Sequence, residues 1–255
     1  MVRFAAAAVM AAILLAGGCG PRRADRAAFD AGYAAFEAGR WQEAADNFTR
    51  YLQSDPTSAT RGEVYYYRGQ AVLHLKQRED ARRDFERAIG AEARPPIDQF
   101  ARVAIGNLYY EEGNDAKALE HYVVVVRKPA KDLPMPMVLL RMGVSLQRLG
   151  RWPMADKYLS YLIEKHPDTP AAAEAMRRVH ADAFRIQTGA FGSHAAAQIE
   201  ANRVQSVGMV ARIARVAANG RTLYAVQVGR ARTYAEAEQQ AERVRRAGFG
   251  ALVVP

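Results

Sequence analysis

Apolar and small residues follow two different periods along the chain. Between positions 25 and 183 they recur every three or four residues, and Gly or Pro stands in the short segments between the periodic stretches. This period indicates amphipathic helices separated by turns. From position 184 apolar and polar residues alternate, first in 184–191 and again in 224–231, which is typical of half-buried strands. The pattern therefore predicts a helical region followed by a small α+β region.

The helical region repeats every 37 residues. The repeat is visible as ladders of small residues and of large apolar residues that keep this interval. The glycine ladder is Gly32, Gly69, Gly106 and Gly143; the alanine ladder is Ala44, Ala81, Ala118 and Ala155; the third ladder is Phe48, Phe85, Tyr122 and Leu159. Seven positions after the ladder glycines come Gly39, Gly113 and Gly150, with Lys76 as the exception.

This pattern resembles tetratricopeptide repeats, in which a small residue stands where paired helices approach and is followed by a turn glycine, an alanine and an aromatic residue. Each helix pair leaves an apolar face that only its neighbour covers, so three or more repeats are needed for a stable stack. We expect four repeats in residues 25–183, with a closing helix in 171–183. Pro95-Pro96 and residues 134–136 lengthen two of the connections.

The resemblance implies a groove, lined by the first helix of each pair, that binds segments of partner proteins. Aromatic rings in such a groove can clamp apolar side chains, and Gln70 and Asn107 can hydrogen-bond an extended backbone. The same side chains can instead pack one repeat against the next, and the sequence leaves both interpretations open. The matching positions are Phe29, Tyr33, Phe36, Tyr66, Gln70, Asn107 and Tyr110.

Residues 184–255 contain an internal duplication with a spacing of 40. Each copy predicts a strand, a helix, a glycine stop and a second strand, and two such copies assemble as a βαββαβ, ferredoxin-like fold. The matched pairs are Gln187 and Gln227, Gly189 and Gly229, Ala197 and Ala237, Val204 and Val244, and Gly208 and Gly248.

In this fold both helices cover one face of the sheet. Alternation directs the apolar positions towards the helices and leaves the intervening positions on an open surface. The positions expected against the helices are Phe184, Ile186, Thr188, Tyr224, Val226 and Val228. The positions expected on the open surface are Arg185, Gln187, Ala225 and Gln227.

The duplicated region resembles the SPOR (sporulation-related) domain, whose family binds peptidoglycan, particularly glycan strands stripped of stem peptides. The resemblance is carried by residues 187–191, 193–197 and 224–229 together with Gly208, Thr233, Glu236, Ala237 and Gly248. It implies glycan contacts at Gln187, Ala190, Arg185, Gln227 and Phe191. Glutamine amides can pair with N-acetyl groups and hydroxyls, and arginine can meet the lactyl carboxylate of the muramyl sugar.

The duplicated region departs from the family's pattern in two ways, one of them confined to the second copy. It reads Arg230-Ala231 where the family usually has Pro-Phe, and Glu200 and Gln240 occupy helix positions where the family tends to place leucine. The first copy therefore keeps the pattern more closely, and we expect the sugar at Gln187 before Gln227.

The first nineteen residues resemble the signal and lipobox of bacterial lipoprotein precursors. Arg3 is followed by an apolar run in 4–16, then by small residues and Cys19, the only cysteine of the chain. The resemblance implies cleavage before Cys19 and acylation of that residue, which anchors the chain to a membrane. Gly20 stands where aspartate favours inner-membrane retention, so an outer-membrane lipoprotein facing the periplasm of a Gram-negative cell is expected.

Charge and composition exclude several functions. Residues 184–255 carry ten Lys or Arg against four Asp or Glu, which suits an anionic or polyhydroxyl polymer, or only a solvated basic surface. Those four acids all fall on predicted helices and give no catalytic carboxylate pair, and the five histidines have no metal or triad spacing. The open positions of the sheet lack the aromatic residues that RNA-binding sheets use. We therefore expect no enzyme, no cofactor, no metal and no nucleic-acid partner.

The sequence thus predicts a lipoprotein that binds denuded glycan strands through its C-terminal domain and recruits envelope or cell-division proteins through its repeats. The alternative is a scaffold for outer-membrane or Tol-Pal type assembly in which the C-terminal domain is degenerate and has lost its glycan. In either case the expected division is a signal peptide in 1–18, a tether in 19–24, the repeats in 25–183 and the C-terminal domain in 184–255.

Overall fold

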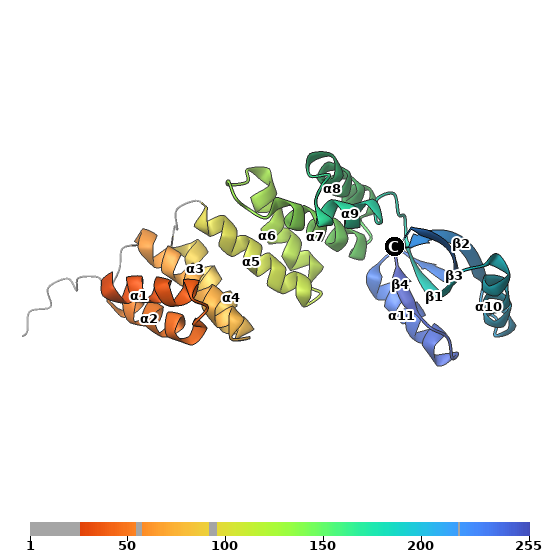
Figure 1. Cartoon of the computed structure of the whole chain (residues 1–255), viewed down its shortest axis with the longest axis horizontal. Coiled ribbons are helices and arrows are strands. Elements are labelled where there is room, and N and C mark those ends of the chain that lie inside the picture. Colours follow the sequence, from red (N-terminus) through yellow and green to blue (C-terminus); the bar gives the residue numbers. More distant parts are fainter. Residues whose placement is uncertain (1–25, 55–57, 92–95, 219) are drawn as a thin grey trace, which may run out of the picture.

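A computed structural model describes residues 26–54, 58–91, 96–218 and 220–255 (Figure 1). The expected signal peptide and tether, with Cys19 and Gly20, lie outside these residues. Within the described ranges, no helix combines the length and the apolar character needed to cross a membrane.

Eight helices form four consecutive pairs, which Figure 1 shows stacked side by side into an elongated array. A short ninth helix, α9, follows and packs on α7 and α8. The bounds are α1 Arg26–Glu37, α2 Trp41–Gln53, α3 Ser58–His74, α4 Arg78–Gly90, α5 Ile97–Glu111, α6 Asp115–Arg127, α7 Met135–Arg148, α8 Trp152–Lys165 and α9 Pro170–Met176. The predicted helical solenoid is confirmed, although α9 is shorter than the closing helix expected in 171–183.

The ladder glycines lie where the two helices of a pair come closest. Each faces the large residue sixteen positions later, and a Cβ atom at any of them would lie only 2.5–2.8 Å from that side chain. Real Cβ atoms do not approach so closely, so a larger residue would force the pair apart. The facing pairs are Gly32 and Phe48, Gly69 and Phe85, Gly106 and Tyr122, and Gly143 and Leu159.

The turn between the helices of each pair needs a left-handed residue. Gly39, Gly113 and Gly150 have φ angles of 70°, 74° and 73°, and Lys76 has a φ of 64° at the matching position. Lys76 therefore adopts the same left-handed conformation as the three glycines, although glycine is the residue best suited to it.

The C-terminal region is a four-stranded antiparallel sheet with strand order β2-β3-β1-β4 and two helices. Its elements are β1 Phe184–Phe191, α10 His194–Ser206, β2 Ala211–Ala218, β3 Arg221–Ala231, α11 Tyr234–Arg246 and β4 Leu252–Val254. Val204 of α10 and Val244 of α11 pack in one cluster with Ile186 and Val228 of the sheet. Both helices therefore cover the same face, and the predicted βαββαβ fold is confirmed.

The last helix pair packs directly against this sheet. Trp152 at the start of α8 is buried, its ring centroid lies 4.9 Å from that of Phe184, and its Nε1 donates a hydrogen bond of 2.9 Å to the Arg232 carbonyl. Tyr234 at the start of α11 stacks edge-on against Phe184 and lies beneath the guanidinium of Arg148 from α7. An aromatic cluster thus joins the solenoid to the C-terminal domain.

Candidate functional site

On the face opposite the helices, strand register brings polar side chains into one row. Arg212 of β2 pairs with Gln227 of β3, Gln227 pairs with Gln187 of β1, and Gln187 pairs with Leu252 of β4. Directly opposed residues of neighbouring strands point to the same face. Because Val228, next to Gln227, packs against the helices, this row lies on the uncovered face. We call Arg212, Gln227 and Gln187 the polar row, which ends at the apolar Leu252 of β4.

A second row of small residues lies beside the polar row. Ala214 of β2 pairs with Ala225 of β3, which pairs with Ala190 of β1. The middle residue of this row, Ala225, has no exposed surface, so a ligand can reach the row only at its ends. Ala190, the outermost of the three, is exposed.

The two matched glutamines of the duplication are in different states. Gln227 is 7 % exposed, and its Oε1 accepts hydrogen bonds from Nε and Nη2 of Arg212 at 3.1 Å and 2.8 Å. Gln187 is half-buried, and its amide forms no side-chain hydrogen bond with any residue that the structure describes. The amide of Gln187 is therefore available to a ligand, whereas the carbonyl of Gln227 is already occupied.

Arg185 extends the polar surface beyond the row. Its guanidinium lies 3.4 Å from Asp182, the carboxylate that also accepts a hydrogen bond of 2.8 Å from Arg230. The hydrogen bond from Arg230 lowers the pKa of the Asp182 carboxyl. Asp182 is thus ionised at neutral pH and balances part of the positive charge of these two arginines.

The expected exposure of Ala225 and Gln227 is wrong. Ala225 has no exposed surface and Gln227 is buried. Both belong to β3, which has a neighbouring strand on each side, and Arg212 lies over Gln227. Arg212 was not among the predicted site residues, because the alternation of β2 assigns it to a face without indicating which residue it meets.

A β-bulge changes the positions at the end of β1. Gln187 pairs with Gln227, yet Gly189 pairs with Val226, so Thr188 is an extra residue and does not take the helix-facing position that alternation predicts. Phe191 consequently shares the face of Val226 and packs towards α10. The structure therefore does not bring Phe191 together with the other predicted glycan contacts.

The two polar residues that replace leucine have partners within the domain. Gln240 lies over Gly229 and its Nε2 donates a hydrogen bond of 3.2 Å to the Arg230 carbonyl. Glu200 forms an ion pair of 2.8 Å with Arg203 on the same helix. These departures are accommodated locally and do not reach the uncovered face.

Three of the predicted groove residues line one pocket of the solenoid. Tyr66, Gln70 and Asn107 surround a cavity of about 280 Å³ together with Arg141. Gln70 donates a hydrogen bond of 3.1 Å to the Tyr66 hydroxyl, and Asn107 accepts one of 2.8 Å from Tyr122. The two amides therefore help to pack the repeats and also face the pocket, so the two interpretations are not exclusive. Arg141 was missed, because its position in α7 belongs to none of the repeating ladders of the sequence.

The other predicted groove residues lie elsewhere. Phe29 and Tyr33 line a separate depression at the first repeat. Phe36 packs edge-on against Trp41 with ring centroids 5.3 Å apart. Tyr110 lies beneath the guanidinium of Arg148, 4.7 Å from its ring centroid. The seven residues thus divide between two pockets and the packing between helices.

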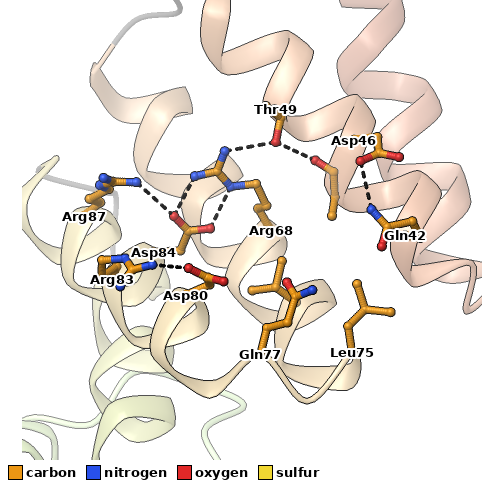
Figure 2. A pocket seen from close by; sticks show the side chains of 12 residues that line it. Gln42, Asp46, Thr49, Arg68, Leu75, Gln77, Asp80, Arg83, Asp84 and Arg87 are labelled. Atoms are coloured by element: carbon orange, nitrogen blue, oxygen red, sulfur yellow. Dashed lines mark hydrogen bonds and ion pairs between the residues drawn. The ribbon is translucent and has the colours of Figure 1, made fainter.

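A charged pocket lies between α2, α3 and α4 (Figure 2). At its centre Arg68 binds the buried carboxylate of Asp84 through two hydrogen bonds of 2.7 Å and donates a third of 3.1 Å to Thr49. Arg87 lies 3.4 Å from the same carboxylate. The paired charges of Arg68 and Asp84, with Arg87 beside them, thus link α3 to α4 at the centre of the pocket. Among the residues that the structure describes, no three His, Cys, Asp or Glu side chains are arranged to hold a metal ion.

Comparison with known proteins gives matches for both regions. Residues 180–255 match the family model of the SPOR domain, and residues 26–58 and 137–169 match that of the tetratricopeptide repeat. None of the curated proteins matches the chain.

Several solved structures are similar to the chain. One is PilF of Pseudomonas aeruginosa, 19 % identical over 61 % of this chain and 66 % of that chain, with a TM-score of 0.51. Another is MamA, 21 % identical over 58 % of this chain and 80 % of that chain, with a TM-score of 0.48. A third is the peptidoglycan binding domain of the B. subtilis cell wall lytic enzyme CwlC, 30 % identical over 28 % of this chain and 86 % of that chain, with a TM-score of 0.24. The likeness to PilF shows the fold of the helical region.

Proposed function

Because this chain carries tetratricopeptide repeats and a C-terminal SPOR domain, we propose that it binds the glycan strands of peptidoglycan and holds a second envelope protein in its repeats. The SPOR domain suggests peptidoglycan binding, and the repeats suggest interaction with proteins. Tetratricopeptide repeats and SPOR domains are binding domains without catalytic activity, which is consistent with a binding protein and not an enzyme.

The unpartnered amide of Gln187 is the observation that supports the glycan proposal most directly. A half-buried amide is partly desolvated, and it has no hydrogen-bond partner within the described part of the protein. A ligand that supplies a donor and an acceptor would therefore offset the cost of that desolvation. Ala190 leaves room beside it, and Arg185 adds a cation on the same face. An N-acetyl group offers both the donor and the acceptor that this amide can use.

We further propose that the chain is anchored in the outer membrane through an acylated Cys19 and faces the periplasm. A tether of residues 19–24 reaches at most roughly 20 Å when extended. The repeats would then act as the spacer between membrane and wall. The packing of Trp152 against Phe184 supports this arrangement, because it makes the C-terminal domain continuous with the solenoid.

Co-sedimentation of the purified chain with cell-wall sacculi tests the glycan proposal. The chain is expected to pellet with sacculi and to pellet more strongly after an amidase has removed the stem peptides. Gln187→Ala should weaken binding by roughly twofold to tenfold, the range of one or two neutral hydrogen bonds. Gln205→Ala, an exposed glutamine of α10 far from the uncovered face, should bind as the unchanged chain does.

Two results would contradict the proposal. If the unchanged chain ignores both untreated and amidase-treated sacculi, the domain has no glycan ligand, and the scaffold for outer-membrane or Tol-Pal type assembly becomes the better interpretation. If Gln187→Ala and Gln205→Ala pellet equally, the glycan does not lie on the predicted face.

A further inference from the structure

Two cavities of the solenoid lie at equivalent places in the repeat, two units of 37 residues apart. Both lie between the second helices of neighbouring pairs, α2 and α4 in the first case and α6 and α8 in the other. The pocket around Asn107 is lined instead mainly by first helices, namely α3, α5 and α7. The matching residues of the two cavities are Thr49 and Val123, Arg83 and Lys157, Asp84 and Tyr158, and Arg87 and Tyr161.

The first of these cavities is crossed by an ion pair, and the second is not. Between α2 and α4, Arg68 reaches Asp84 and Thr49 through hydrogen bonds of 2.7–3.1 Å (Figure 2). Two repeats later Met142 takes the place of Arg68 and is buried in the core. No Cα atom of α6 lies within 8 Å of one in α8. The cavity between these helices measures about 850 Å³, against about 370 Å³ for the first.

The lining of the larger cavity is mostly apolar, and part of it is in water. Tyr161 of α8 is 48 % exposed. Met154, seven residues earlier and therefore on the same side of that helix, is 50 % exposed. Covering such side chains removes apolar surface from water, which favours a partner at this place. The apolar lining consists of Val123, Val126, Pro129, Met135, Tyr158 and Tyr161.

Two cations at the larger cavity have no acidic partner. Arg127 of α6 and Lys157 of α8 line it and are exposed, and neither forms a salt bridge with a residue that the structure describes. Glu164 also lines the cavity, but its carboxylate is paired with Lys165 at 2.7 Å. Each of the two helices thus presents an uncompensated positive charge beside an apolar surface. This combination complements a ligand that carries both acidic and apolar groups.

The dimensions of the cavity indicate the form of that ligand. Its lining residues on α8 run from Lys157 to Glu164, which corresponds to about 10 Å along a helix, or two turns. A single side chain would leave most of the 850 Å³ empty. An amphipathic helix places large apolar side chains one turn apart on one face and can flank them with acidic residues.

We propose that the cavity between α6 and α8 is a docking site for an acidic, amphipathic helix of a partner protein. Apolar side chains of that helix enter between α6 and α8, and the acidic residues beside them meet Arg127 and Lys157. The inference goes beyond the proposed function, because this site is formed by second helices and is separate from the pocket around Asn107. The solenoid then has two faces that hold proteins.

The test selects ligands from a displayed library of random peptides of about sixteen residues, long enough for four helical turns. The library is selected on the full chain. Enriched peptides should carry apolar residues at spacings of three and four, with Asp or Glu beside them. Fluorescence anisotropy then measures the affinity of an enriched peptide for the full chain and its variants.

Variants of α8 locate the peptide, and the equivalent cavity provides the control. Tyr161→Ala should weaken binding by about tenfold, the range of one aromatic contact. Lys157→Glu should weaken it by about threefold to tenfold at low salt and by less at high salt. Arg83→Glu makes the same change of charge at the matching exposed position of the first cavity, and should alter binding by less than about twofold. Unfolding curves identify any variant that loses its fold.

Four results would overturn the inference. The first is a selection without acidic amphipathic peptides, and the second is equal weakening by Lys157→Glu and Arg83→Glu, which general electrostatics would explain. The third is a loss of affinity in Arg141→Glu but not in Tyr161→Ala. Such peptides occupy the pocket around Asn107, which supports the proposed function alone.

The fourth result is that this face has another occupant in place of the peptide. Dimers in sedimentation that Tyr161→Ala abolishes would assign it to a second copy of the chain. Binding to phosphatidylglycerol vesicles that the same substitution abolishes would assign it to a membrane surface. Co-sedimentation with sacculi is independent of all these outcomes, so the glycan proposal stands or fails separately.

Discussion

The two halves of the C-terminal domain share their local construction. Ser193 and Thr233 each cap the following helix by accepting a backbone hydrogen bond of 3.2 Å. The aromatic residue that begins each helix packs edge-on against the strand of the other half, with ring centroids 5.5 Å apart in one case and 5.6 Å in the other. The two pairs are His194 with Tyr224 and Tyr234 with Phe184.

The halves differ in what their polar groups and turns contact. Gln187 of the first half has an unpartnered amide, whereas Gln227 of the second is bound by Arg212. The turn before α11 rests on Trp152 and Gly150 of the solenoid, whereas the matching turn before α10 has no such neighbour among the described helices. The comparison teaches that one copy of the unit anchors the domain while the other keeps its surface free for a ligand.

The largest effect is expected from removing the anchor of the second half. Trp152→Ala deletes a buried ring from the cluster with Phe184 and Ala237 and should lower the free energy of unfolding by about 3–5 kcal/mol. Urea unfolding followed by tyrosine fluorescence and circular dichroism would measure it. Trp152→Phe keeps a ring but removes the donor to the Arg232 carbonyl, and should cost about 1–3 kcal/mol. An unchanged midpoint in Trp152→Ala would show that the two regions are not joined through this residue.

A smaller effect separates the matched glycines of the two halves. Gly229 has a φ of 68° and faces the Gln240 side chain, whereas Gly189 has no positive φ and its added Cβ would meet the Phe191 ring at 2.8 Å. Gly229→Ala should cost about 1–2 kcal/mol, since the left-handed conformation penalises any Cβ. Gly189→Ala should cost less, about 1 kcal/mol, because the half-buried ring can shift.

The control for this pair is the double variant Gly229→Ala, Gln240→Ala. It removes the steric contact but leaves the φ angle, so most of the loss should persist. Recovery of full stability in the double variant would show that crowding, and not backbone conformation, distinguishes the two halves. Thermal or urea unfolding midpoints of the three variants provide the measurement.

The repeats and the duplication were predictable because both rest on intervals that the sequence displays directly. The 37-residue ladder predicted that Gly69 stands where paired helices approach, and the alternation in the first copy of the duplication predicted the face of the sheet on which Gln187 lies. In each case the same structural position in every repeat requires a residue of similar size or polarity, and the sequence shows this as a fixed interval. The expectation that Gln187 is better placed than Gln227 agrees with their hydrogen bonding, although the role of either in binding stays a prediction.

Features that depend on pairing between distant segments were not predictable. Alternation in β1 could not reveal the bulge at Thr188, because a bulge is a property of the hydrogen-bond ladder with β3. For the same reason Phe191 was assigned to the wrong face. Arg212 contacts Gln227 only because of the register between β2 and β3. The two residues are fifteen positions apart, and the sequence between them does not reveal that register. The packing of Trp152 on the domain requires the orientation of two folded regions, which no local pattern encodes.

The smallest predicted effect concerns Asp182, the carboxylate that links the halves by contacting Arg185 of the first and Arg230 of the second. Since Asp182 is exposed, Asp182→Asn should change the free energy of unfolding by no more than about 0.5 kcal/mol. The hydrogen bond from Arg230 lowers the pKa of Asp182, so the substitution removes a full negative charge at neutral pH. Both arginines then lose their counter-charge.

If Asp182 only neutralises this face, Asp182→Asn should bind denuded glycan strands about twofold to threefold more tightly at low salt, and the gain should vanish at high salt. Asp168→Asn makes the same change of net charge at an exposed site of the solenoid and should leave binding unaltered. Weaker binding by Asp182→Asn would mean instead that this carboxylate orients Arg185 for the ligand. The free surface of the first half would then depend on a contact that it shares with the second.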